Sequence, residues 1–214
     1  MLCFVRAQEP DEGLPPRAEV KQLQALIRRI EVLEEMRQAE ENRLANAASE
    51  VQPSIERMIA LLKKEITEFE RQIKEHIDKH PNLKEQSRLL ETIPGIGKRT
   101  AHLLLSEIEF ERYSSARSIA AQAGVTPRKR QSGTSLKQTS LSKLGNARLR
   151  KALYFPAIVA RQHNEIVKEF AKRLKSRGKT PMQIVCAAMR KLLHIAFGVL
   201  KHNRAFDSSL AFSA

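Results

Sequence analysis

The sequence is short of the residues from which many enzymes and secreted proteins build their sites. Its two cysteines, Cys3 and Cys186, lie far apart, and neither has a second Cys or a His at metal-ligand spacing. This pattern argues against a disulfide framework and a zinc site. The aspartates are limited to Asp11, Asp78 and Asp207. Because most phosphodiester-cutting enzymes hold their metal ions with carboxylates, we expect no metal nuclease site made by this chain alone.

Long apolar runs are also lacking. None approaches the roughly 20 residues that a membrane span needs, and the apolar start, Met-Leu-Cys-Phe-Val, is too short for a signal core. We therefore expect a cytoplasmic protein with no membrane partner. At 214 residues, with 42% hydrophobic and 29% charged residues, the chain is long enough for one or two domains with a real core.

Negative charge is scarce in the second half of the chain. The formal net charge of +14 divides into −3 for residues 1–91 (15 Lys/Arg, 18 Asp/Glu) and +17 for residues 92–214 (23 and 6). Residues 126–151 contain no carboxylate, seven small hydroxyls before Gly145 and eight cations. These cations are Arg128, Lys129, Arg130, Lys137, Lys143, Arg148, Arg150 and Lys151. Such a composition is suited to gripping phosphates, so the basic half is the expected polyanion binder.

Helical periodicity covers most of the chain and predicts an all-α fold. After an irregular lead-in over 1–16, an apolar stripe from Leu23 to Leu44 predicts one long helix over about 19–48. Pro53 marks the start of a second helix, over about 53–79, whose apolar residues follow a heptad pattern. The short connection favours a long antiparallel coiled-coil helical hairpin over 17–80. The pattern leaves open whether the seam pairs within one chain or in a homo-oligomer.

A compact helical domain is expected over 81–206, followed by a flexible tail over 207–214. Its first feature is a glycine turn between helices over 83–92 and 102–108, the pattern of a helix-hairpin-helix motif. Gly95 and Gly97 permit a tight turn, and Lys98 and Arg99 favour a phosphate at the start of the next helix. A plain Gly-Pro turn between packed helices is the alternative.

Further helices are predicted over 116–123, from Gly145-Asn146 onward, over 164–177 and over 182–200, the last as the central core helix. Arg148, Arg150 and Lys151 fall in the first turns of the helix that Asn146 opens. Because cations oppose the dipole at that end, they call for an anion or a functional reason. Two smaller expectations concern other charged residues. Glu107, Glu109 and Glu111 are expected at a solvated helix end, and His194 as a packed core histidine.

Candidate nucleophiles are confined to the hydroxyls of the basic segment, among them Ser132, Ser135, Thr139, Ser140 and Ser142. A serine attacks a phosphate only if it loses its proton and if the developing charge is stabilised, which guanidinium groups can do. Ser132 lies two residues after an arginine and just before a glycine that allows close approach to a ligand. On spacing alone, a turn residue or a hydroxyl contact to phosphate is a much better explanation of Ser132 than a nucleophile.

Several runs of this sequence resemble the C-terminal half of insertion-sequence 110/116/902 transposases. The similarity covers roughly residues 80–206. The matching runs are Leu89 to Gly97, Ala121 to Arg128, Ser132 to Ser135, Ser142 to Asn146, Leu149 to Tyr154 and Met189 to Leu193.

This resemblance implies a DNA recombinase from a mobile element, with an N-terminal RuvC-like domain that binds magnesium and a C-terminal domain whose serine becomes joined to DNA. The family serine corresponds to Ser132, with Ser135 and the neighbouring cations as positioning groups. DNA-binding residues are then expected at Gly95, Gly97, Lys98, Arg99, Arg128, Lys129, Arg130, Ser135, Lys137, Lys143, Asn146, Arg148, Arg150 and Lys151. An element-encoded guide RNA is a further implied partner.

The sequence departs from the family because no acidic tetrad precedes the expected coil. We therefore expect a truncated or decayed transposase, or the separately encoded distal part of one, inactive alone. It would have no cofactor of its own, and magnesium only where a RuvC-like domain is supplied. Two other classes remain open. They are a non-catalytic helix-hairpin-helix nucleic-acid-binding protein, for which only the basic half matters, and a coiled-coil assembly protein.

Overall fold

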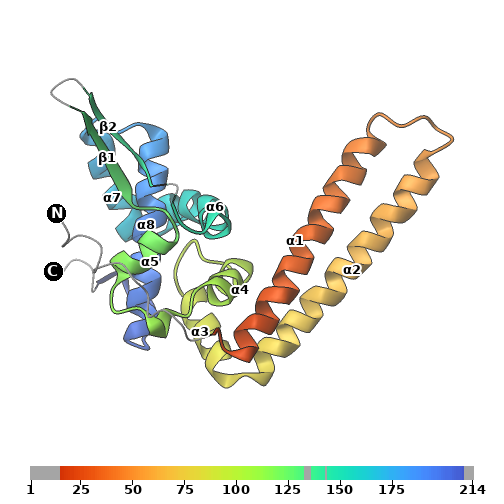
Figure 1. The fold of residues 1–214 in the computed structure, drawn as a ribbon, viewed down its shortest axis with the longest axis horizontal. Coiled ribbons are helices and arrows are strands. Elements are labelled where there is room, and N and C mark those ends of the chain that lie inside the picture. Colours follow the sequence, from red (N-terminus) through yellow and green to blue (C-terminus); the bar gives the residue numbers. More distant parts are fainter. Residues whose placement is uncertain (1–14, 133–135, 143, 210–214) are drawn as a thin grey trace. The chain divides into compact units, whose positions relative to one another are not determined.

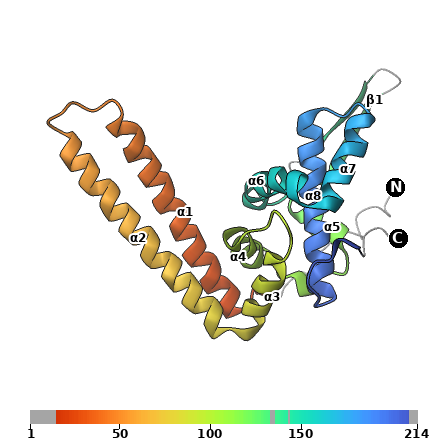
Figure 2. The ribbon, with the colours of Figure 1, turned by 180° about the vertical axis from the view of Figure 1, so that it is seen from behind.

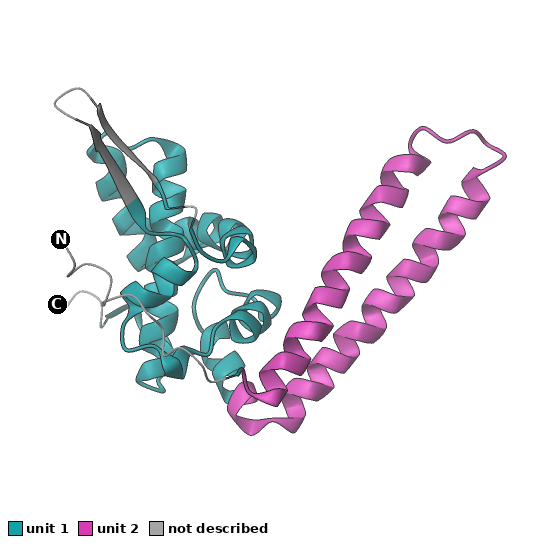
Figure 3. Cartoon of the chain, viewed as in Figure 1, with its two compact units in different colours: residues 1–15, 85–214 teal, residues 16–84 magenta. Residues whose placement is uncertain are grey.

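The computed structural model describes residues 15–132, 136–142 and 144–209, and between 128 and 140 it describes the backbone. These residues form eight α-helices, one 3-10 helix and one two-stranded ribbon. The predicted all-α class is confirmed, and the ribbon is the β-structure that the described residues add to it. The chain divides into two compact units, residues 16–84 and residues 85–209 with Pro15, coloured separately in Figure 3.

The first unit is a hairpin of two long helices, α1 (Ala18–Leu44) and α2 (Gln52–Lys79), which run side by side in opposite directions (Figures 1 and 2). Pro53 lies in the first turn of α2, where its missing N–H costs nothing. The seam between the helices is lined by Val20, Leu23, Ile27, Ile30 and Leu33 of α1 and by Ile59, Leu62, Ile73 and Ile77 of α2. The helical hairpin is therefore present as predicted, while its coiled-coil character stays a prediction.

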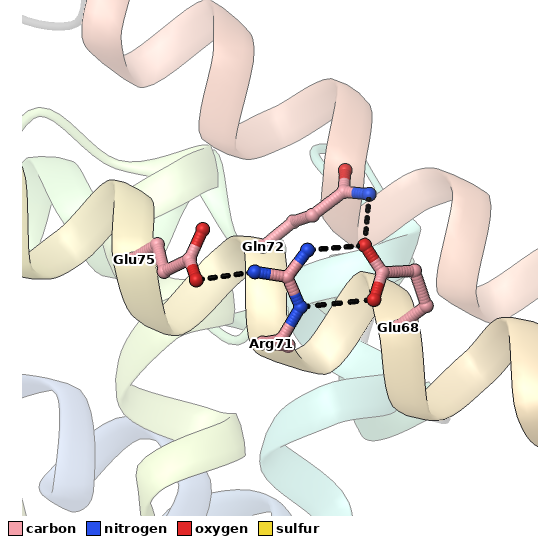
Figure 4. A network of polar contacts seen from close by, with 4 residues as sticks. All are labelled: Glu68, Arg71, Gln72 and Glu75. Carbon is pink, nitrogen blue, oxygen red and sulfur yellow. Dashed lines mark hydrogen bonds and ion pairs between the residues drawn. The ribbon is translucent and has the colours of Figure 1, made fainter.

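Toward the connecting loop, the hairpin exposes apolar side chains. Met36 of α1 and Met58 and Leu61 of α2 are between 46% and 52% exposed. Elsewhere the surface of α2 is polar. Arg71 pairs with Glu68 and Glu75, and Gln72 donates to Glu68 (Figure 4). These hydrogen bonds lower the pKa of Glu68 to about 2.

In the second unit, α8 (Pro181–Lys201) is the central helix and packs against α5 (Ala116–Gln122), α6 (Ala147–His163), α7 (Glu165–Ser176) and the 3-10 helix η1 (Phe110–Arg112). The Thr180 hydroxyl accepts from the Gln183 N–H and the Gln183 side chain accepts from the Thr180 N–H. This capping box fixes the start of α8 beside Pro181. The predicted core helix is thus confirmed in place and burial.

By length and composition, α8 is the one helix of the described residues that could cross a membrane. Half of its most apolar window is buried inside the protein, and the core helix of a soluble protein has the same composition. It also contains Arg190 and Lys191 in its middle.

Two further helices precede the basic segment. Helix α3 (Pro81–Glu91) spans the boundary between the units, and α4 (Lys98–Glu107) packs against α6. Helix α5 begins at Ser115, whose hydroxyl accepts from the Ser118 N–H at 3.3 Å. The ribbon, β1 (Pro127–Ser132) and β2 (Leu136–Leu141), follows α5 and leads into α6.

Candidate nucleic-acid interface

The basic segment forms an antiparallel ribbon. Strand β1 pairs with β2 from Pro127 opposite Leu141 to Ser132 opposite Leu136. Arg128, Arg130 and Ser132 occupy alternate positions of β1, and alternate positions of a strand share one face. The predicted nucleophile therefore lies at the end of β1, on the same face of the strand as two of the predicted phosphate-binding arginines.

The other predicted residues of the segment are described to different extents. Arg128, Lys129, Arg130, Ser132 and Lys137 are placed through their backbone, on the two strands. Ser135 and Lys143 lie outside the described residues. The remaining predicted cations belong to α6 and have described side chains.

The root of the ribbon is the place where the chain enters it after α5 and leaves it before α6. It contains two closely packed glycines with positive φ. Gly145, at φ +121°, lies so close to the end of α5 that a Cβ there would be 2.3 Å from the Gln122 carbonyl oxygen and 2.7 Å from the Gly124 nitrogen. Gly124 has φ +65°, and a Cβ on it would be 2.6 Å from the Leu144 carbonyl oxygen. Only glycine combines such φ values with this approach. The segment that enters the ribbon and the segment that leaves it are therefore held together by backbone packing.

Backbone hydrogen bonds close the same root. The Asn146 N–H donates to the Gln122 carbonyl at 2.6 Å, and the Ser142 N–H donates to the Thr126 carbonyl at 2.9 Å. Asn146 also caps α6, since its side-chain oxygen accepts from the N–H groups of Arg148 and Leu149. As predicted, α6 starts immediately after Gly145-Asn146.

Glu107, at the end of α4, ties α6 to this root. Its side chain is only 5% exposed, its Oε2 accepts from the Asn146 amide at 2.6 Å, and its Oε1 lies 3.4 Å from Nε of Arg148. The predicted solvated position is wrong for Glu107. It is also wrong for Glu109, whose side chain is 9% exposed and pairs with Arg112 at 3.0 Å. Glu107 is buried because α4 ends against the start of α6, where its carboxylate lies beside Arg148 and the N-terminus of the helix.

Two of the predicted DNA-binding cations thus have protein partners. Arg148 faces Glu107, and Nη1 of Arg150 donates to the Ala123 carbonyl at 3.4 Å. Asn146 is occupied as a helix cap and as a donor to Glu107. These three residues contribute to the root of the ribbon. Lys151 is exposed on α6.

The turn between α3 and α4 presents its two glycines differently. Gly95, at φ +104°, packs on α6, where a Cβ would lie 2.7 Å from Cβ of Ala160 and 2.9 Å from the Pro156 carbonyl oxygen. Gly97 is exposed, with nothing within 4 Å of an added Cβ, and it begins α4. Gly95 therefore serves packing. The exposed part of the turn is Gly97 with Lys98 and Arg99, and the helix-hairpin-helix assignment remains a prediction.

One buried histidine follows this turn. His102 of α4 is 7% exposed and its Nε2 has no hydrogen-bond partner. Burial, with a smaller contribution from Lys98, lowers the pKa of His102. His194, predicted as a core histidine, is half-buried, and its Nε2 accepts from Arg190 at 3.4 Å.

No three His, Cys, Asp or Glu side chains of the described part lie close enough together to hold a metal ion. Cys186 is a free thiol of α8, while Cys3 lies outside the described residues.

Comparison with known proteins places these features in a family. Residues 87–172 match the model of the "Transposase IS116/IS110/IS902 family". A pilin gene-inverting protein of Moraxella bovis is 43% identical over 148 residues, which are 68% of this chain and 46% of that protein. The chain belongs to the IS116/IS110/IS902 transposase family. The matched region runs from α3 into α7 and includes the glycine turn, the ribbon and its root.

Other members of the transposase family are also similar. The transposase of insertion element IS1328 from Yersinia enterocolitica is 31% identical over 148 residues, 67% of this chain and 43% of that protein. A protein of insertion element IS110 from Streptomyces coelicolor is 26% identical over 161 residues, 75% of this chain and 39% of that protein. The chain thus spans less than half the length of these relatives.

The family region has a charge feature wider than the predicted segment. Between Glu111 and Glu165 there is no carboxylate over residues 112–164. Eleven cations lie in this stretch: Arg112, Arg117, Arg128, Lys129, Arg130, Lys137, Lys143, Arg148, Arg150, Lys151 and Arg161. Sequence reasoning missed Glu107 as the buried partner of this stretch, although it is among the last acidic residues before it.

Proposed function

We propose that this chain is the DNA-binding part of a transposase that cuts and rejoins DNA through Ser132. The observation that carries the proposal is the carboxylate-free stretch 112–164, which contains the ribbon and lies inside the family region. Two of its cations, Arg112 and Arg148, pair with Glu109 and Glu107 from outside the stretch, but the excess of positive charge over the stretch still favours phosphate groups. The name of the Moraxella relative supports inversion of a DNA segment as the class of reaction.

Phosphate contact is tested by the salt dependence of duplex DNA binding. Each phosphate neutralised contributes about −0.9 to the slope of log K against log salt concentration. Lys129→Gln on β1 is expected to reduce the slope by about that amount. Lys172→Gln on α7 is the matched control, because Lys172 is exposed, lies outside the stretch and pairs with Glu169 at 2.6 Å. A slope near zero for the unchanged chain would contradict DNA binding.

The proposed chemistry is a transesterification. The Ser132 hydroxyl loses its proton as its oxygen bonds to phosphorus, and the displaced sugar oxygen takes up a proton as its bond to phosphorus breaks. The positions of Arg128 and Arg130, on the same face of β1, support a role in stabilising the negative charge of the transition state. The resemblance implies that magnesium is held by a RuvC-like domain, so we propose that such a domain must be supplied for the reaction to take place.

The nucleophile is tested by trapping a covalent protein–DNA adduct with the full chain, a RuvC-like domain and magnesium. We expect an adduct with the unchanged protein and with Ser140→Ala, which replaces a hydroxyl of the opposite strand paired with Arg128. We expect none with Ser132→Ala. An adduct that persists in Ser132→Ala would assign the attack to another group.

Assembly and location complete the proposal. A homo-oligomer through residues 17–80 is supported by the exposed Met58 and Leu61 on α2. The resemblance supports a guide RNA, and the sparse cysteines support a cytoplasmic location. Light scattering of a Met58→Glu, Leu61→Glu variant tests the oligomer: we expect a smaller mass with unchanged helix content. An unchanged mass would exclude this surface as the interface.

A further inference from the structure

Helix α6 carries an exposed aromatic ring. Phe155 is 73% exposed and Val159, one turn later on the same face, is 44% exposed. The other described phenylalanines, Phe69, Phe110, Phe170, Phe197 and Phe206, are buried or half-buried. Phe155 is therefore the one phenylalanine of the described residues that faces solvent.

The ring of Phe155 is supported from within α6. Its centroid lies 5.4 Å from that of Tyr154, and the two rings are nearly perpendicular, at 82°. This edge-to-face arrangement is a favourable aromatic geometry. Because most of Phe155 remains accessible, the contact steadies the side chain and leaves surface for a further partner.

The charge around Phe155 indicates the kind of partner. Lys151 is exposed one turn before Phe155 on the same face. Helix α6 contains no carboxylate, and the carboxylate-free stretch extends before it as far as residue 112, while Glu165 begins the next helix. A polyanion that presents flat, apolar faces fits a cationic helix with an aromatic ring, and nucleic acid has both properties.

The apolar area is small for a protein partner. A stable protein interface buries about 800 Å² on each side, whereas one aromatic side chain buries about 150–250 Å². Phe155 with Val159 falls well short of such an interface. The same area is sufficient for one nucleic-acid base, whose face is covered by a single ring.

We infer that the exposed face of α6 stacks an unpaired DNA base on Phe155 while Lys151 contacts a neighbouring phosphate. This inference rests on the proposed DNA binding and names the form of DNA that α6 takes. Bases inside a duplex are covered on both faces by their neighbours, so the stacked base must be unpaired or extruded. DNA strands that are opened for rejoining offer such bases.

The test compares the binding of the full chain to a single-stranded DNA oligonucleotide and to the duplex of the same sequence. Loss of one stacked base weakens single-strand binding by about 5- to 150-fold, and we expect this for Phe155→Ala. We expect duplex affinity to change less than twofold, and the salt slope to stay the same because no charge is removed. Phe155→Trp should retain single-strand affinity, and Val159→Ala serves as the matched control on the same face.

The outcomes separate this inference from the proposed function. If the duplex binds with a salt slope but Phe155→Ala leaves single-strand binding unchanged, the stacking inference is wrong and DNA binding stands. If neither form of DNA binds, the proposed function fails. A loss of affinity confined to single-stranded RNA of the same sequence, or a fall in oligomer mass for Phe155→Ala, would overturn the assignment to DNA. An unchanged thermal midpoint for Phe155→Ala confirms that the variant is folded.

Discussion

Replacing Gly145 with alanine perturbs the root of the ribbon at its closest backbone contact. An alanine at φ +121° leaves the regions that L residues occupy, which costs about 1–3 kcal/mol. The added Cβ would also lie 2.3 Å from the Gln122 oxygen, 2.7 Å from the Gly124 nitrogen and 2.9 Å from the Ala121 oxygen. All three are backbone atoms, so no change of rotamer relieves the overlap.

Relief of this overlap therefore requires the segment that enters the ribbon and the segment that leaves it to separate. That movement weakens the 2.6 Å hydrogen bond from the Asn146 N–H to the Gln122 carbonyl, a loss of about 1 kcal/mol. Overpacking adds about 1–3 kcal/mol. We expect Gly145→Ala to lower the free energy of unfolding by about 3 kcal/mol or more.

Two other glycines provide controls that separate backbone strain from overlap. Gly178 has φ +71° and nothing within 4 Å of an added Cβ, so Gly178→Ala should cost about 1–2 kcal/mol. Gly198, inside α8, has ordinary φ and also open space, so Gly198→Ala should stabilise by about 0.5–1 kcal/mol. Denaturant unfolding followed by circular dichroism measures all three, and hydrogen exchange locates the change. A cost for Gly145→Ala no larger than that for Gly178→Ala would refute the reasoning.

Three further predictions concern charged and titrating groups. Glu107→Gln removes the anion next to Arg148 and is expected to lower the free energy of unfolding by about 1–3 kcal/mol; unchanged denaturant unfolding would contradict this. Because the pKa of His102 is lowered in the folded state, the unfolded chain binds more protons, so stability is present above the ordinary pKa of about 6.5 and falls as the pH falls below it. His102→Leu should flatten this dependence between pH 7 and 5, and an unaltered pH profile would exclude His102 as its source. The pKa of Glu68 is lowered from 4.5 to about 2, so its ionised carboxylate stabilises the hairpin above pH 4.5 and this contribution is lost as the pH falls toward 2. We expect helicity to fall over this range, as measured by circular dichroism at low salt, and Glu68→Gln should remove that part of the pH dependence.

The helices could be predicted because their ends carry local signals. Thr180-Pro181, Ser115 and Asn146 each start a helix within a residue or two of the predicted position, since capping depends on a side chain and the next few N–H groups. The first helix ends earlier than expected, at Leu44 instead of about residue 48. There, Ala45 to Ala48 contain no proline or glycine that would mark the end.

The ribbon could not be predicted from hydrophobic alternation. Strand β1 contains no apolar residue between Pro127 and Ser132, so it lacks the period of two that identifies a half-buried strand. The available signal was the Ser-Gly pair between two short runs without helical pattern, which is typical of a hairpin turn. The role of Glu107 was hidden for a different reason, since its partners lie about 40 residues later and meet it only through the packing of α4 on α6.

The structure gives two cations of the basic segment a role that composition does not reveal. Arg148 and Arg150 contact Glu107 and the Ala123 carbonyl, so their charge and donors help to hold the ribbon root. A count of positive residues therefore overstates the number of phosphate contacts.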